Sequence, residues 1–203
     1  MLISLDYLIK KYNVRLTGVL HVGAHECEEL QAYEKYIARD KILWIEAMQD
    51  KVDLCKKRYP NILIEKAVVS DTVETVLFNV ANNGQSSSIL EMGIHTALHP
   101  HVRYVKSYEE RTTPLSALLP KYQIPFNFVN LDIQGAELKA LRGMQEYMDN
   151  VEYVYTEVNC DYVYKDCALI GEIDEFLLKY NLHRVETRWA ENGKWGDAFY
   201  IKK

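Results

Sequence analysis

The sequence predicts an α/β protein with a doubly wound, mostly parallel sheet of seven strands and helices on both faces. Short apolar runs alternate with amphipathic segments along most of the 203 residues, as strands and helices do in a parallel sheet. Gly23 and Gly135 each follow an apolar run, where a strand turns sharply into a helix. Two final β-rich segments, 182–188 and 197–201, flank a Gly-containing turn and predict an antiparallel hairpin at the C-terminal edge.

The composition fits one globular domain that spans residues 1–203. Hydrophobic residues make up 48% and charged residues 26%, which is ordinary for such a domain. The net charge of −5 and the lack of a basic run argue against a nucleic-acid surface. No run approaches the roughly 20 apolar residues of a membrane span, and the first residues lack the features of a signal peptide. Because no membrane span is predicted, we expect no membrane contact. The four cysteines have no C-x-x-C spacing, so we expect reduced thiols and a cytoplasmic location.

The first part of the chain supplies the first three strands. Strands are predicted at 19–22, 41–47 and 61–69, and helices at 1–15, 29–38 and 50–58. The strands are apolar runs bounded by turn residues, whereas the helices repeat apolar residues at a spacing of three or four. Acidic residues after Gly23 favour the start of a helix, and Pro60 ends the third one.

The middle of the chain interrupts this alternation. Segment 75–80 is predicted to be a short extra strand, and from 81 to 111 the periodicity is lost. Connections of this length inside a compact domain are usually lids or binding loops, or they contain a short helix. We therefore expect 81–111 to be a lid or acceptor loop.

The second part of the chain restores the alternation and closes with the hairpin. Strands are predicted at 126–133 and 151–158, and helices at 115–119, 134–148 and 169–180. Pro114 favours a helix start because proline suits the first helical position. Ligands of such sheets bind outside the carboxyl ends of the strands, so candidate site residues are sought there.

The turn after the first strand indicates a class of ligand. Glu46 ends the second strand 23 residues after Gly23, near the roughly 20-residue spacing at which an acid reaches ribose hydroxyls. A pyrophosphate-binding turn needs G-x-G-x-x-G, but positions 25 and 28 hold His and Glu. A ligand with ribose and adenine but no pyrophosphate fits better, and S-adenosyl-L-methionine is the obvious one. The alternative is an ordinary strand-to-helix turn with a chance Glu.

The most specific string is NLDIQGAE at 130–137, followed by Leu-Arg-Gly at 141–143. Together with HVGAH and WIEA at the ends of the first two strands, it resembles the FkbM family of S-adenosylmethionine-dependent methyltransferases. Matches at AVVSD, QSSS, TTPL and GDAFY follow in the family's order, and the resemblance spans 16–201. It implies a Rossmann-like class I methyltransferase sheet. His21 stands where the family commonly has an acid, and Asn130 where it usually has Lys.

The resemblance also implies which residues hold the cofactor. Glu46 would accept hydrogen bonds from both ribose hydroxyls, as a carboxylate can. Gly23 and Ala24 would line the methionine portion, with His21 beneath it. The other expected contacts are Ala47 and Met48 beside ribose and adenine, Asp71 near the adenine, and Ser87 in the serine run that lines the cofactor or the acceptor. The alternatives are a solvated strand end for Glu46 and a plain turn residue for Asp71.

Two carboxylates are candidates for catalysis. Asp132 ends its strand and is the leading acid/base or acceptor-positioning residue, because methylating a hydroxyl requires removal of its proton. Its alternative role is to fix the cofactor or the adjacent turn. Glu157 on the next strand is the second choice, whereas Glu137 is expected to open its helix. His95 and His99 have i, i+4 spacing but no Glu between them in the H-E-x-x-H sense, so we expect no metal site.

These residues predict an S-adenosylmethionine-dependent O-methyltransferase that acts on a hydroxyl of a sugar, a glycan or another small acceptor. Two other hypotheses remain open. A cofactor-binding module that no longer catalyses is motivated by His21 and Asn130. A nicotinamide oxidoreductase is disfavoured by the missing glycines of the pyrophosphate turn.

Overall fold

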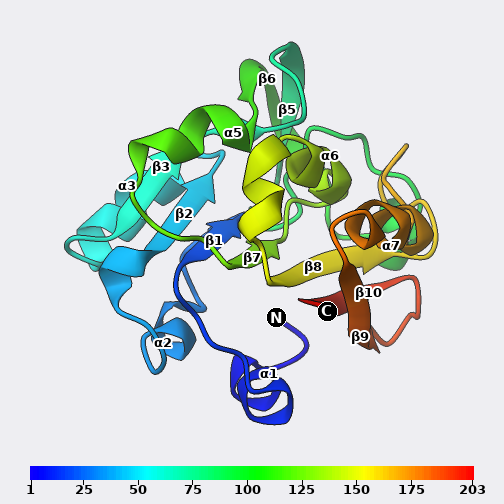
Figure 1. Ribbon diagram of the computed structural model, residues 1–203. Helices are drawn as coiled ribbons and strands as arrows, with labels where there is room; N and C mark the ends of the chain where they lie inside the picture. Colours follow the sequence, from blue (N-terminus) through cyan, green and yellow to red (C-terminus); the bar gives the residue numbers. More distant parts are fainter.

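The computed structural model describes residues 1–203 and contains the expected seven-stranded sheet (Figure 1). Its strands are β1 Val19–Val22, β2 Ile42–Glu46, β3 Leu63–Lys66, β7 Phe128–Leu131, β8 Tyr153–Asn159, β9 Leu182–Trp189 and β10 Trp195–Lys202. Their order in space is β3-β2-β1-β7-β8-β10-β9. Only β10 runs antiparallel to its neighbours, so the mostly parallel sheet with an antiparallel C-terminal hairpin is confirmed.

Helices cover both faces of this sheet (Figure 1). The α-helices are α1 Leu5–Tyr12, α2 Leu30–Tyr33, α3 Gln49–Arg58, α4 His95–Leu98, α5 Leu115–Leu118, α6 Glu137–Arg142 and α7 Ile170–Leu178, and short 3-10 turns lie at Arg39–Lys41, Leu119–Lys121 and Gln145–Asn150. The core under α1, α2 and α3 is separate from the core under α5, α6 and α7. Successive residues of a strand point to opposite faces, so Val19 enters the first core and Leu20 the second. This is why the central strands are apolar throughout.

A second, three-stranded sheet departs from the sequence expectation. It consists of β4 Val68–Val69, β5 Thr75–Ala81 and β6 Tyr104–Thr113 in the order β4-β6-β5. The expected strand 61–69 is therefore split between two sheets, and the expected loop 81–111 ends in a ten-residue strand. The irregular part of that loop is 82–103, apart from α4. Most residues of β6 are polar and at least partly exposed, so this strand lacks the alternation that identifies a half-buried strand.

The helix expected at 29–38 is also shorter than predicted. Only α2 is helical there, and the turn that precedes it holds His25 and Cys27 at φ values of 43° and 58°. No helix N-terminus therefore faces the end of β1. The acidic residues of this turn pair with other side chains instead, as Glu26 does with Lys51 at 2.8 Å.

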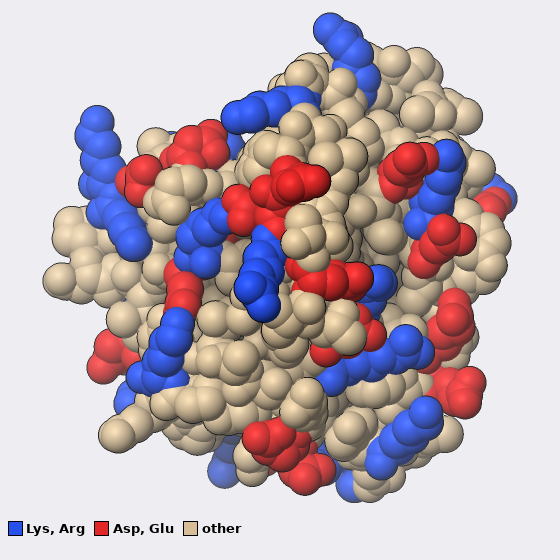
Figure 2. Space-filling model, turned by 90° about the horizontal axis from the view of Figure 1, so that it is seen from above, with Lys and Arg blue, Asp and Glu red and all other residues tan.

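The surface mixes charges of both signs. On the face shown in Figure 2, Lys and Arg side chains are interspersed with Asp and Glu, and neither sign gathers into one broad patch. None of the helices combines the length and the apolar character that a membrane crossing requires.

Candidate active site

A cavity of about 440 Å³ lies at the carboxyl ends of β1, β2, β7 and β8. The chain leaves β1 toward β2 and β3 on one side of the sheet and later returns to β7 and β8 on the other side. Such a reversal of strand order opens a crevice, and in open α/β sheets ligands bind there. The topology therefore places the cavity where the sequence predicted a ligand.

The turn after β1 packs directly against the end of β7. Gly23 has a φ of 92°, and a Cβ added to it would lie 1.9 Å from the carbonyl oxygen of Asp132. Both the conformation and the contact require glycine at this position. Gly23 lines the cavity, whereas Ala24 is buried beside it and is not part of the lining. Of the two residues expected to line the methionine portion of the cofactor, only Gly23 borders the cavity.

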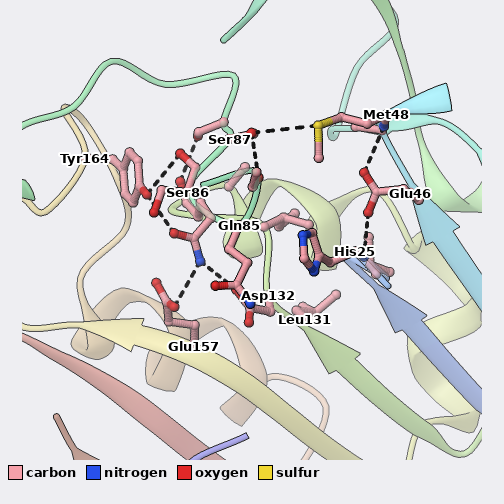
Figure 3. Close-up of a pocket in the computed structure, with 18 of the residues that line it drawn as sticks. His25, Glu46, Met48, Gln85, Ser86, Ser87, Leu131, Asp132, Glu157 and Tyr164 are labelled. Atoms are coloured by element: carbon pink, nitrogen blue, oxygen red, sulfur yellow. Dashed lines mark hydrogen bonds between the residues drawn. The ribbon is translucent and has the colours of Figure 1, made fainter. Parts of the chain in front are cut away.

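Glu46 is the last residue of β2 and is 5% exposed. One carboxylate oxygen accepts a hydrogen bond from the backbone N–H of His25 at 2.7 Å, and the other accepts one from Met48 N–H at 2.8 Å (Figure 3). Burial raises the pKa of this carboxyl, and the two backbone donors counteract part of that rise. Each oxygen keeps a lone pair directed away from its backbone donor, so the carboxylate can still accept two hydroxyls of a ribose.

The wall next to Glu46 is apolar and suits a flat ring. Met48 and Val68 pack with Phe78 of β5, and all three line the cavity together with Ala47. Ser87 lies over this wall, with its hydroxyl 3.9 Å from the Met48 sulfur (Figure 3).

Asp71 is the one predicted cofactor residue that lies apart from the others. Its carboxylate accepts a hydrogen bond from the neighbouring Ser70 hydroxyl at 3.1 Å, and it does not line the cavity. The strand that leads to it, β4, still lines the cavity with Val68 and Val69, and the chain leaves the cavity between Val69 and Asp71. The structure therefore corrects the expectation that Asp71 lies near the adenine, because Asp71 does not reach the cavity.

His21 and Asn130 face each other across β1 and β7. The Asn130 amide donates to the Tyr33 hydroxyl at 2.7 Å and lies 3.3 Å from His21 Nδ1. The imidazole also stacks on Trp44 with ring centroids 4.4 Å apart. Burial lowers the pKa of His21 to about 4, so the ring is neutral at neutral pH. The two positions that depart from the FkbM pattern therefore form one neutral, hydrogen-bonded cluster.

Asp132 and Glu157 are held by one amide. Gln134 Nε2 donates to Asp132 Oδ1 at 2.6 Å and to Glu157 Oε2 at 3.2 Å, while the Tyr164 hydroxyl donates to Gln134 Oε1 at 2.6 Å. The Asp132 carboxylate is exposed to the cavity, and the protein that surrounds it weakens its hydration and raises its pKa to about 6. Burial raises the pKa of Glu157 well above its usual value, and the neighbouring carboxylates add to this effect.

The other residues expected near this end have distinct roles. Glu137 is buried and accepts hydrogen bonds from Ile133 N–H at 3.0 Å and Gly135 N–H at 3.1 Å, so it stabilises the turn into α6. His95, His99 and His101 line the cavity. The structure contains no group of three His, Cys, Asp or Glu side chains that could hold a metal ion.

Sequence reasoning missed Gln134, Tyr164, Trp195 and Asp197 as residues of the site. Gln134 and Asp197 lie in the strings that carry the resemblance, and only the structure shows that their side chains reach the cavity. Tyr164 and Trp195 belong to a small apolar cluster that joins the loop around α4 to the loop after β8. Gly93 N–H donates to Val163 O at 2.9 Å, which fastens these two loops together. Nothing in the sequence marks that pairing, because both segments are irregular.

Comparison with known proteins gives one family and a common fold. Residues 21–184 match the family described as the methyltransferase FkbM domain. No curated protein matches the sequence.

Several solved structures share the fold at low sequence identity. Magnesium protoporphyrin IX methyltransferase from Synechocystis, solved with bound S-adenosylmethionine, is similar with a TM-score of 0.54 at 7% identity, covering 98% of this chain and 76% of that one. A ribosomal protein L11 methylase from Lactobacillus delbrueckii has a TM-score of 0.55 at 11% identity, with coverage of 98% and 76%. An S-adenosylmethionine-dependent methyltransferase from Clostridium acetobutylicum has a TM-score of 0.53 at 8% identity, with coverage of 97% and 89%.

Proposed function

The chain belongs to the FkbM methyltransferase family, and we propose that it methylates a hydroxyl oxygen of a sugar, a glycan or another small acceptor. The cofactor of this family is S-adenosylmethionine, which supplies an electrophilic methyl group on a sulfonium when bound. The residues of this chain would hold that cofactor, exclude water and accept the proton that the acceptor hydroxyl loses.

The cavity fits S-adenosylmethionine by its chemistry. Glu46 offers two acceptor oxygens for the ribose diol, and the wall of Met48 and Phe78 offers an apolar surface for the adenine. The cofactor carries a net positive charge, and no Lys or Arg lines the cavity. The same absence disfavours a nicotinamide dinucleotide, because its two phosphates would find no Lys or Arg partner here.

The observation that carries the proposal is the position and the pKa of Asp132. Its carboxylate opens onto the cavity at the carboxyl end of β7. A general base works best when its pKa lies near the working pH, and the pKa of about 6 leaves Asp132 ionised at neutral pH. Asp132 would accept the proton of the acceptor hydroxyl as the oxygen is methylated. Burial and the neighbouring carboxylates also raise the pKa of Glu157, which opposes a second negative charge beside Asp132.

The alternative of an inactive cofactor-binding module rests on His21 and Asn130. These residues are cross-strand partners, so the two departures from the family pattern lie side by side in the sheet. Both are hydrogen-bonded and neutral, so neither leaves a buried charge without a partner. This supports a site that keeps its architecture rather than one that has lost it.

Calorimetric titration with S-adenosylmethionine, and with NAD as a control, tests the proposal. We expect micromolar affinity for the first ligand alone, which corresponds to about −8 kcal/mol. Methyl transfer is then followed by release of S-adenosylhomocysteine with hydroxyl acceptors, beginning with sugars. Binding of NAD without binding of S-adenosylmethionine would overturn the proposal, and cofactor binding without turnover on a broad acceptor panel would favour the inactive module.

A further inference from the structure

The cavity extends beyond the expected place of the cofactor. Figure 3 shows Glu46 and Met48 at one side of the cavity, Tyr164 and Glu157 at the other, and Asp132 between them. Tyr164 lies beside His95, with ring centroids 5.3 Å apart. We call the part of the cavity lined by His95, His99, Glu157, Tyr164 and Trp195 the acceptor end, because Asp132 separates it from the ribose and adenine contacts.

Acidic side chains dominate the charges around this cavity, and the cation among its lining residues is the N-terminal ammonium of Met1, which lies 3.4 Å from Glu29. Six carboxylates line it, and no Lys or Arg does: Glu28, Glu29, Glu46, Asp132, Glu157 and Asp197. The His95 imidazole adds no positive charge at neutral pH, because burial lowers its pKa to about 4.

The cations on the surrounding loops are paired with acids outside the cavity. Lys165 lies 2.5 Å from Glu91, and Lys194 lies 2.9 Å from Asp161. None of these four residues lines the cavity. An anionic group at the acceptor end would thus lie beside the Asp132 carboxylate without a Lys or Arg partner.

We propose that the acceptor end takes hydroxyl compounds without an anionic group and excludes phosphates and carboxylates. The inference rests on the proposed methyltransferase function and narrows its substrate class. Placing an anion next to the Asp132 carboxylate inside this cavity is unfavourable, since both the partial loss of hydration and the repulsion oppose it. A neutral hydroxyl compound meets neither cost, and the imidazole, indole and phenol groups of this end offer hydrogen bonds and apolar ring faces.

The proposal also indicates which class of reaction precedes the methylation. A sugar linked to a nucleotide diphosphate, or a sugar phosphate, carries the charge that this end excludes. The sugar would be methylated only after a glycosyl transfer, or a phosphate hydrolysis, has removed the phosphate groups. The class of reaction that supplies the acceptor is therefore one that releases the nucleotide diphosphate or the phosphate.

The first experiment measures the charge preference at the reaction centre without any acceptor. Sinefungin carries an ammonium close to the place of the transferred methyl, whereas S-adenosylhomocysteine has no positive charge there. We expect sinefungin to bind about tenfold more tightly in calorimetry, and Asp132→Asn to reduce this ratio toward one. Equal affinities, or a ratio that Asp132→Asn leaves unchanged, would overturn the proposal.

The second experiment compares acceptors that differ only in charge. Methyl glucoside and its C6 carboxylate counterpart, methyl glucuronide, are tested with S-adenosylmethionine for release of S-adenosylhomocysteine. The neutral sugar is expected to react at least about tenfold faster, and His99→Lys to narrow the difference by supplying a cation. Equal or faster methylation of the glucuronide would contradict the proposed exclusion of anionic acceptors. If neither sugar reacts, the sinefungin ratio decides.

Failure of the proposed function and failure of the inferred substrate class give different experimental results. If the protein does not bind S-adenosylmethionine, the proposed function fails and the charge preference has no basis. If it binds the cofactor and shows no preference for sinefungin, the function stands and only the substrate class is wrong.

Discussion

Replacing Glu46 by Gln tests the best-defined contact of the site. Both carboxylate oxygens accept backbone hydrogen bonds, from His25 N–H at 2.7 Å and from Met48 N–H at 2.8 Å. Gln has the same shape, but one of its two terminal groups is an NH₂ donor. That group must face a backbone N–H, so one existing hydrogen bond is lost, and one of the two ribose hydroxyls loses its acceptor.

The size of the effect follows from the charge of Glu46. A hydrogen bond to a charged group contributes about 1.5–3 kcal/mol, so the loss of one ribose contact lowers cofactor affinity by about 10- to 150-fold. The loss of one backbone contact lowers the free energy of unfolding by a similar amount of about 1.5–3 kcal/mol. Both effects stay local, since Glu46 forms no ion pair.

Calorimetry with S-adenosylmethionine and urea unfolding measure the two effects. Glu109→Gln is the matched control, because Glu109 is an exposed residue of β6 away from the cavity and the same chemical change there should alter neither value. If Glu46→Gln bound the cofactor as tightly as the parent while remaining folded, the ribose assignment would be refuted.

Four further predictions follow from other contacts. Asp132→Asn should lower kcat by a larger factor than it lowers affinity for the cationic cofactor, and the rise of the parent's rate as pH passes about 6, where Asp132 ionises, should disappear in a pH–rate profile. The same variant should be more stable than the parent at pH 8 but not near pH 4, because a raised carboxyl pKa destabilises the folded protein only when the group is ionised; urea unfolding at both pH values decides this. His21→Asp should cost about 3–5 kcal/mol of unfolding free energy, and adding Asn130→Lys should restore much of it, as a double-mutant cycle would show. Gly23→Ala should cost about 2 kcal/mol or more, measured by urea unfolding, because its Cβ meets the Asp132 carbonyl and its φ is positive.

The sequence predicts the parts of the fold that are set by burial. The central strands are apolar on both faces and stand out from their surroundings, and Glu46 marks the end of β2 because it follows an apolar run. The strand β6 escapes such reasoning, since its residues are mostly polar and its partner β5 pairs with it through backbone groups that any sequence offers.

Contacts between irregular segments are the second class of feature that the sequence does not predict. The site at Asp132 depends on Gln134 and Tyr164, and Tyr164 is placed by a loop that pairs with residues around α4. Asp71 shows the opposite error. Its string matches the family, but only Val68 and Val69 of that string line the cavity, and the turn that follows β4 places Asp71 outside it. Motif order locates the strands, whereas the direction of a side chain in the following turn depends on the path of the chain.

The departures at His21 and Asn130 show why register matters for function. In the sequence these residues lie 109 positions apart and count as two separate losses from the family pattern. In the sheet they are direct neighbours on β1 and β7, and both contact Tyr33. An acid and a lysine at these two places would face each other as opposite charges. The pair present here is neutral, and both side chains have hydrogen-bond partners. A paired replacement conserves the balance of charge under the cofactor turn, which supports a functional cofactor site over a decayed one.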